Sequence, residues 1–222
     1  MSKEMTLDII REVVNVGIGD AAAALSALIN SRVIIEVPEI HIINTQDAPD
    51  FIQKETRSLG VYITQDFKGT FRGKAGLFYT KESCTSLLRT ILGELIVTSA
   101  LTDTAIATLQ EIGNIIMVSC VSTISNMLED TVDFQIPDVT LEISEGYFRN
   151  LVKGLGDLDK TIVVRNQMIV KDKEIEGYFF LMLSFKDFLS LIEKMEDKNK
   201  KQRLPKTFLS TEKSHNAAEE TP

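Results

Sequence analysis

A carboxylate and a carboxamide stand at helical spacing near the start of this chain. Asp8, Glu12 and Asn15 occupy positions i, i+4 and i+7, so a helix places all three on one face, away from its apolar stripe. Asparagine is a mediocre helix former, so one in the middle of a helix needs a reason other than helix formation. A carboxylate can pair with a cation, and a carboxamide both donates and accepts hydrogen bonds without titrating. These side chains are therefore the first candidates for a functional surface.

The same pattern returns 99 residues later. Glu111 and Asn114 repeat the first Glu and Asn, with Ala107 in the place of the aspartate. Pro38 and Pro137 follow the two asparagines at the same distance, with 22 residues between, where each helix is expected to give way to a strand. One surface pair of this kind would be unremarkable, whereas two in register with a proline indicate a function.

Similarity between the two halves extends well beyond these residues and predicts an internal duplication. Two segments of the first half match segments of the second half in their apolar positions: 8–42 with 107–141, and 71–88 with 175–192. The chain is therefore expected to form a single domain over residues 1–195, made of two repeats at about 5–95 and 103–195.

Each repeat is predicted to contain a long helix, a strand, a β-hairpin and a closing helix. Helices are expected over residues 6–30, 81–93, 103–128 and 185–195, and the first of these has an apolar stripe of Ile10, Val13, Val14, Gly17, Ala21, Ala24, Leu25 and Leu28. Strands are expected over 32–43 and 132–143, each broken or bulged by its proline, with hairpins in 59–80 and 160–184. The predicted class is α+β, with one continuous sheet shared about a pseudo-twofold axis and the long helices on one face.

Composition limits the partners of the chain. Its 222 residues include 24 basic and 32 acidic side chains, a net charge of -8, whereas a nucleic-acid binder needs a basic face. Glu4 and Asp8 interrupt the N-terminal stretch, and the most apolar runs are far shorter than the ~20 residues that span a bilayer. A cytoplasmic protein that neither binds nucleic acid nor inserts into a membrane is expected, with residues 196–222 as a disordered polar tail.

Few residues are present for other kinds of chemistry. His41 and His215 are the only histidines, one in a predicted strand and one in the tail, so neither a metal cluster nor a histidine-activated nucleophile is expected. Cys84 and Cys120 are isolated and are interpreted as small buried residues in a reducing compartment.

The segment Gly17-x-Gly19-x-x-Ala22 fits a loose dinucleotide-binding fingerprint, which requires a preceding strand and a tight turn. Here the segment continues a helix. The two glycines are therefore interpreted as positions where another helix or a partner protein approaches closely.

The duplicated motif resembles that of the CheC family of chemotaxis phosphatases, which reads Asp or Ser, three residues, Glu, two residues, Asn, then 22 residues and Pro. The first motif, from Asp8 to Pro38, matches this pattern in full, and the second, ending at Pro137, lacks only the first position. The resemblance covers residues ~5–195. It is to the two-site CheC form, not to the one-site CheX form or to the larger flagellar switch phosphatase.

The resemblance implies hydrolysis of the aspartyl phosphate on a CheY-type response regulator. Asn15 and Asn114 would each orient an attacking water, while Glu12 and Glu111 would dock on a cation of the regulator. The chain would need no cofactor of its own, because the regulator supplies Mg²⁺. An internal duplication also makes a monomer self-sufficient. The alternative is a non-catalytic binding partner of the receptor deamidase CheD, a protein that members of the family bind.

Overall fold

The computed structural model describes residues 3–56, 60–69, 71–93, 102–127, 131–141 and 159–183, together with Ser190 and Glu193. The helices are α1 (Lys3–Leu28), α2 (Ala48–Thr56), α3 (Lys81–Leu92) and α4 (Asp103–Met127), with a short 3-10 turn η1 (Thr45–Asp47). The strands are β1 (Val33–Asn44), β2 (Gly60–Gly69), β3 (Gly73–Thr80), β4 (Val132–Phe134), β5 (Asp138–Leu141), β6 (Lys160–Val170) and β7 (Lys173–Leu183). Of the predicted closing helix at 185–195, only Ser190 and Glu193 are described, and both are helical. The predicted tail at 196–222 lies outside the described residues.

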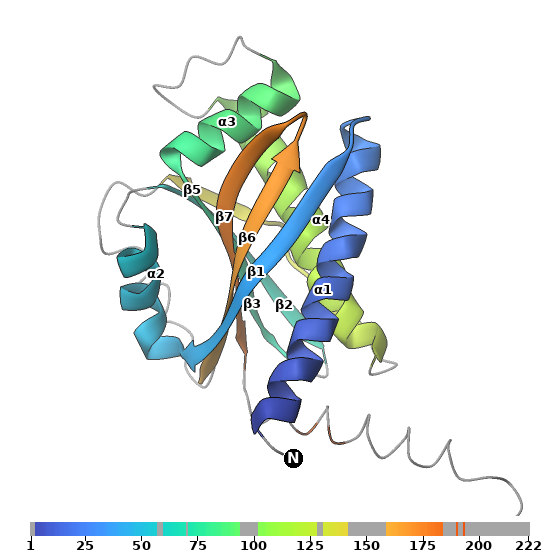
Figure 1. Ribbon diagram of the computed structural model, residues 1–222, viewed down its shortest axis with the longest axis vertical. Coiled ribbons are helices and arrows are strands. Elements are labelled where there is room, and N and C mark those ends of the chain that lie inside the picture. Colours follow the sequence, from blue (N-terminus) through green and yellow to red (C-terminus); the bar gives the residue numbers. More distant parts are fainter. Residues whose placement is uncertain are drawn as a thin grey trace, which may run out of the picture.

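The seven strands form one curled antiparallel sheet, in the order β1-β6-β7-β3-β2-β4, with β5 also paired to β2 (Figure 1). The α+β class and the single sheet are thereby confirmed. Each hairpin pairs with the strand that follows the long helix of the other half: β1 lies beside β6, and β4 and β5 lie beside β2. This order is compatible with an internal duplication about a twofold axis, which stays a prediction.

Both motif prolines lie where the register of the sheet shifts. The pairing of β1 with β6 changes between Glu36 and Glu39, on either side of Pro38. Pro137 falls in the gap between β4 and β5, both of which pair with β2. Proline has no N–H to give to a ladder, so it is tolerated at such irregular positions. The predicted break or bulge at each proline is confirmed.

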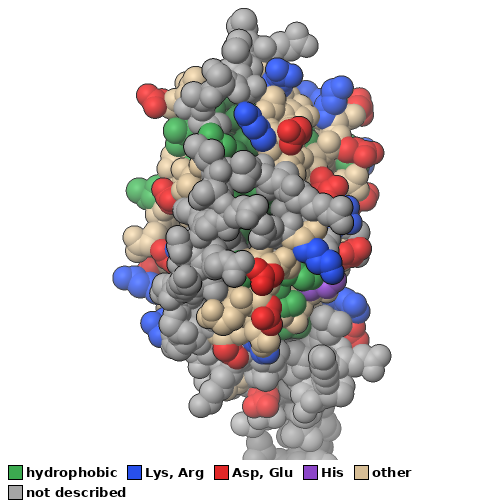
Figure 2. Space-filling view, turned by 90° about the vertical axis from the view of Figure 1, so that its left-hand side faces the viewer, with side chains coloured by type: hydrophobic (Ala, Val, Ile, Leu, Met, Phe, Trp, Pro, Cys, Tyr) green, Lys and Arg blue, Asp and Glu red, His purple; other side chains and the backbone are tan. Residues whose placement is uncertain are grey.

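The two faces of the sheet are covered differently. Buried side chains of α1, α3 and α4 share one large core with one face, and Figure 1 shows α1 and α4 on the same side of the sheet. On the other face, Ala48 and Phe51 of α2 pack in a smaller cluster with Tyr62, Phe78 and Tyr178. Figure 2 views the molecule from the α2 side, where acidic and basic side chains of the described residues are interspersed.

The predicted stripe of α1 is correct in its centre and wrong at its C-terminal end. Ile10, Val14, Gly17, Ala21 and Leu25 are buried, as is Ile18, which the stripe did not include. Ala24 and Leu28 are exposed, and the side chain of Val13 lies outside the described residues. Because Ile18 is buried, the buried face of the helix is shifted toward Ile18 and away from Ala24. Leu28 is exposed because it is the last residue of the helix.

Helix α4 is apolar because it belongs to the core. By length and composition alone, its residues Asp103–Asn126 could cross a membrane. Leu109, Ile112, Met117 and Val121 are nearly inaccessible and pack in the core that α4 shares with α1 and the sheet, whereas Ile115 and Val118 are partly exposed. This packing accounts for the hydropathy of the helix.

Candidate functional site

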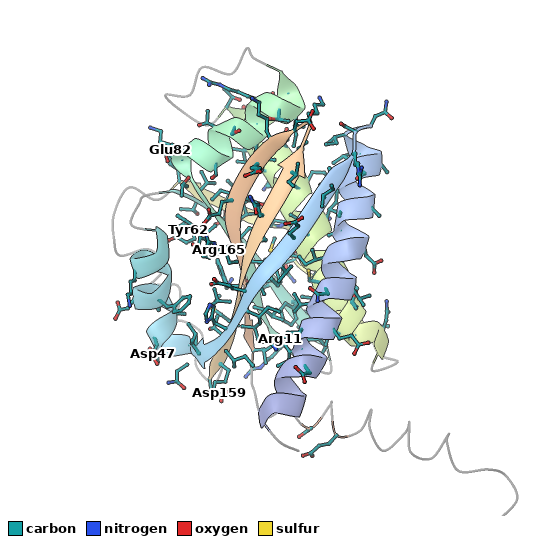
Figure 3. The ribbon with its side chains drawn as sticks, viewed as in Figure 1. Arg11, Asp47, Tyr62, Glu82, Asp159 and Arg165 are labelled. Carbon is teal, nitrogen blue, oxygen red and sulfur yellow. The ribbon has the colours of Figure 1, made fainter. Side chains whose placement is uncertain are left out.

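The three motif side chains of α1 are exposed on its outer side. Asp8, Glu12 and Asn15 are each accessible to solvent. Nη1 of Arg11 donates a long hydrogen bond, 3.4 Å, to Oδ1 of Asp8, and both side chains are more than half exposed (Figure 3). Among the described residues, Glu12 and Asn15 have no hydrogen-bond or ion-pair partner, so both groups are available to another molecule.

The second motif, on α4, is only partly open. Glu111 is exposed and has no ion-pair partner within the described ranges. Asn114 is half-buried, and its Oδ1 accepts a hydrogen bond of 2.9 Å from Nε2 of Gln65. One side of this carboxamide is thus committed to the protein, in contrast to Asn15.

Gln65 is a buried polar residue that the sequence analysis did not single out. It lies in the middle of β2 at 1% exposure, and its Nε2 also donates to the backbone oxygen of Gln135 at 2.7 Å. Its Oε1 is buried with no hydrogen-bond partner among the described residues. A signal was present in the sequence, because Gln65 interrupts the buried alternation of Val61, Ile63 and Phe67.

Two sets of hydrogen bonds connect the backbone around Pro137 to α4. Nε2 of Gln110 donates to the backbone oxygen of Pro137 at 2.8 Å, and Gln65 joins Asn114 to Gln135. The ring of Pro137 is buried, whereas the neighbouring Ile136 is 84% exposed. The proline therefore acts through the backbone around it, and it brings an exposed apolar side chain close to the second motif.

The fold keeps the two motifs apart. Gly17 of α1 packs against the backbone of Cys120 in α4, and the two helices run in opposite directions (Figure 1). Measured from this crossing at 1.5 Å per residue, Asn15 and Asn114 are separated by about 12 Å along the helix axes. The two carboxamides therefore do not share one location on the surface.

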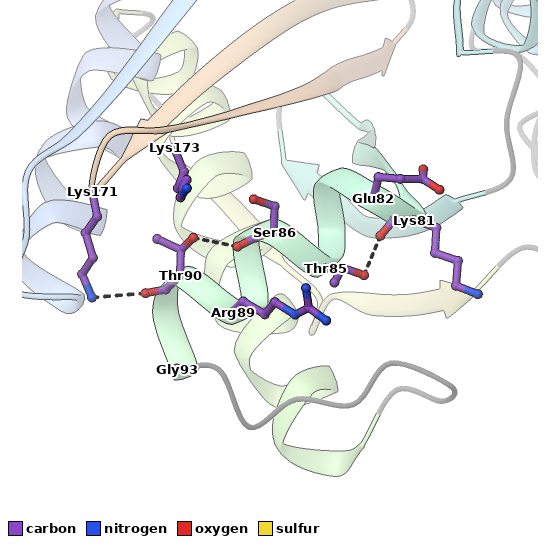
Figure 4. A pocket seen from close by; sticks show the side chains of 9 residues that line it. All are labelled: Lys81, Glu82, Thr85, Ser86, Arg89, Thr90, Gly93, Lys171 and Lys173. Atoms are coloured by element: carbon purple, nitrogen blue, oxygen red, sulfur yellow. Dashed lines mark hydrogen bonds between the residues drawn. The ribbon is translucent and has the colours of Figure 1, made fainter.

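A pocket of about 880 Å³ lies away from both motifs, between α3 and the β6–β7 turn (Figure 4). Its charged lining residues are Lys81, Glu82, Arg89, Lys171 and Lys173. The hydroxyls of Thr85 and Thr90 donate to backbone oxygens one turn earlier in α3, so they are committed to the helix. No motif residue lines this pocket.

The cysteines have no catalytic character. Both are buried, and burial raises the pKa of each thiol to about 12. A thiol of this kind is rarely ionised near neutral pH and is a poor nucleophile. Across the described part of the chain, no group of three His, Cys, Asp or Glu side chains is placed to hold a metal ion.

Comparison with known proteins bears on the second motif directly. The model of the CheC-like family matches residues 105–141, the segment that contains Glu111, Asn114 and Pro137. The chain is also 22% identical over 201 residues to the CheY-P phosphatase CheC of Bacillus subtilis (strain 168), covering 85% of this chain and 93% of that protein. The resemblance to the CheC-like family is confirmed.

Two solved structures resemble this chain in their fold. The crystal structure of Thermotoga maritima FliY superposes with a TM-score of 0.66 at 17% identity, over 91% of this chain and 99% of that one. A chain of the FliG–FliM complex from H. pylori superposes with a TM-score of 0.62 at 14% identity, over 86% and 100%. At these identities the superpositions show a shared fold.

Proposed function

We propose that this chain is a chemotaxis regulator that removes the phosphoryl group from a phosphorylated CheY-type response regulator. One observation carries the proposal: each long helix has an exposed Glu three residues before an Asn that is at least partly accessible, Glu12 with Asn15 and Glu111 with Asn114. The relationship to a protein named CheY-P phosphatase supports the same activity.

The chemistry needs little from the phosphatase. Water attacks phosphorus in line, the bond from phosphorus to the aspartyl oxygen breaks, and inorganic phosphate leaves the regenerated carboxylate. The regulator brings its own Mg²⁺, so the missing element is a water held in line. A carboxamide can hold it because it donates and accepts hydrogen bonds and does not titrate. A hundredfold acceleration corresponds to about 2.7 kcal/mol, which one inserted side chain can supply.

The glutamates have a separate task in this proposal. Glu12 and Glu111 are exposed, so they can pair with a cation near the phosphorylation site of the regulator and fix its orientation. Because a helix places each Glu one turn before its Asn, docking through the carboxylate brings the carboxamide to a defined position.

The test is the decay of a labelled phospho-regulator with and without this chain. Combined Asn15→Ala and Asn114→Ala should abolish the acceleration while circular dichroism and much of the binding stay unchanged. Gln46→Ala, which removes an exposed amide from the turn η1, serves as the control and should have no effect. Full activity in the double variant would refute the mechanism.

The alternative, a non-catalytic partner of the deamidase CheD, is separated by the same assay. Unchanged decay of the phospho-regulator together with tight binding of CheD would select it. The presence of a carboxamide in both motifs favours the phosphatase, because docking alone does not require one.

We further propose that residues 1–195 form one cytoplasmic, monomeric domain built from two repeats of about 5–95 and 103–195. The strand order supports the duplication, since it reads the same from both edges when β1 is equated with β4 and β5, β2 with β6, and β3 with β7. The register shifts beside Pro38 and Pro137 support it as well.

A further inference from the structure

A chain of hydrogen bonds connects the sheet to the second motif. We infer that Gln65 is a positioning residue that holds the Asn114 carboxamide in one orientation, so that the two motif asparagines are presented differently. The consequence for catalysis rests on the proposed phosphatase function, whereas the positioning itself does not.

The orientation of both carboxamides follows from one backbone atom. The oxygen of Gln135 can only accept a hydrogen bond, so the group of Gln65 that lies 2.7 Å away must be its Nε2. The opposite orientation would bring two acceptor oxygens together. The other hydrogen on Nε2 then points to Asn114, which must turn its Oδ1 toward Gln65 at 2.9 Å.

This arrangement determines which hydrogen-bonding groups of Asn114 are available to a bound molecule. Its Oδ1 has used one of two lone pairs, and its Nδ2 has no hydrogen-bond partner among the described residues. The bond restrains the oxygen side of the amide, while Nδ2 stays available to a bound molecule.

Burying the polar side chain of Gln65 costs free energy unless its two N–H groups donate hydrogen bonds. The side chain is 1% exposed and its Oε1 is left without a partner in the described structure. An apolar residue would fill the same space without an unsatisfied oxygen, as its neighbours Ile63 and Phe67 do. Packing alone therefore does not explain a glutamine here, but the two bonds that it donates do.

A matching residue lies beside the first motif proline, in the second half of the chain, and lacks this function. Asn166 in β6 lies opposite the register shift at Pro38, just as Gln65 lies opposite the one at Pro137. It is buried, alternates with the core residues Val164 and Met168, and also has an unpartnered side-chain oxygen. Asn166 is one methylene shorter than Gln65, and no bond joins it to the exposed Asn15. Asn166 is therefore the natural control.

Positioning has a measurable consequence for each site. Asn15 must lose its rotational freedom when a regulator docks, whereas Asn114 has already lost much of it. Removing both donors with Gln65→Met, which keeps the length of the side chain, should lower kcat at the second site by about two- to tenfold. The concentration of regulator for half-maximal rate should change little.

The first experiment is nuclear magnetic resonance on the protein alone. In the parent protein the side-chain amide of Asn114 should show restricted fast motion and that of Asn15 should not. Gln65→Met should bring Asn114 to the mobility of Asn15, whereas Asn166→Leu should leave Asn114 unchanged. Equal mobility of the two amides in the parent protein would overturn the inference, whatever the activity of the chain.

The second experiment is a double-mutant cycle on phospho-regulator decay. With the first site disabled by Asn15→Ala, Gln65→Met should lower kcat and Asn166→Leu should not. With the second site disabled by Asn114→Ala, Gln65→Met should leave kcat unchanged, because no carboxamide is left for Gln65 to position. Equal losses in the two backgrounds would mean a general structural defect and would overturn the positioning role. If the unmodified chain does not accelerate decay of the phospho-regulator, the proposed function is refuted. The nuclear magnetic resonance result then decides by itself whether Gln65 positions Asn114.

Discussion

A Cβ atom added to Gly17 would lie 2.7 Å from the Cα of Cys120. Such a distance is not found between real atoms of this kind, so α1 and α4 approach each other as closely as they do because position 17 carries only hydrogen. The contact sets the crossing point of the two long helices, and therefore the separation of the two motifs along them. The interpretation of Gly17 as a helix-approach residue is confirmed.

Gly17→Ala should therefore destabilise the fold, and Gly19→Ala should not. The first change forces α1 away from a backbone atom, which costs about 1–3 kcal/mol. The second adds a methyl group to an exposed helical position with no atom within 4 Å, and should stabilise the chain by about 0.5–1 kcal/mol. Urea unfolding measures both. Equal effects of the two alanines would show that the close contact is not needed.

The sequence predicted the elements and their order well because periodicity and proline act locally. The long helices are found within a few residues of their predicted ends, and both prolines lie at register shifts. Helix α2 was missed: among its described side chains, Ala48 and Phe51 pack against the sheet, whereas Asp50 and Lys54 are exposed. Its place depends on the far face of the sheet, which no local pattern reveals.

The candidate site was predicted only in part, for a related reason. Glu12, Asn15 and Glu111 are exposed as their helical spacing predicted. The burial of one side of Asn114 depends on Gln65, which is 49 residues away and reaches it through the sheet. Contacts between distant elements of this kind leave only a weak sign in the sequence, here a polar residue in an apolar strand.

Neutralising either glutamate should weaken docking without removing the chemistry. Glu12→Gln and Glu111→Gln each remove an exposed charge, so the concentration of regulator for half-maximal rate should rise by about two- to tenfold. The rate at saturation should be kept. The effect should fade as salt is added, because exposed pairs are screened. Glu82→Gln, an exposed glutamate of α3, is the matched control and should leave both parameters unchanged.

Alkaline pH should destabilise the fold through its two buried thiols. Burial raises the pKa of Cys84 and Cys120 from 9.0 to about 12, so the folded state keeps its protons while the unfolded state releases them. The free energy of unfolding should therefore be unaffected by these groups below pH 9 and should fall as the pH rises from 9 toward 12. A variant with both cysteines changed to alanine should show a shallower fall. Identical slopes would mean that the thiols are accessible in the folded protein.

Ile136 should contribute to docking at the second motif. The side chain is 84% exposed beside the backbone that Gln65 and Gln110 fasten to α4, so it stands within reach of a protein bound at Asn114. Burying an isoleucine stabilises a contact by about 1.5–3 kcal/mol, so Ile136→Ser should raise the half-maximal concentration at least about tenfold. Stability should change by less than about 0.5 kcal/mol, because this side chain is already largely exposed in the folded protein.

The matched control for this prediction is Leu92→Ser, which removes a partly exposed apolar residue from the C-terminal end of α3. It should leave docking unchanged. The comparison is sharpest in the Asn15→Ala background, where only the second site acts. If Ile136→Ser has no effect there, the regulator approaches Asn114 from a direction that avoids the turn at Pro137, and the docking surface must follow the outer side of α4 toward Glu111 instead.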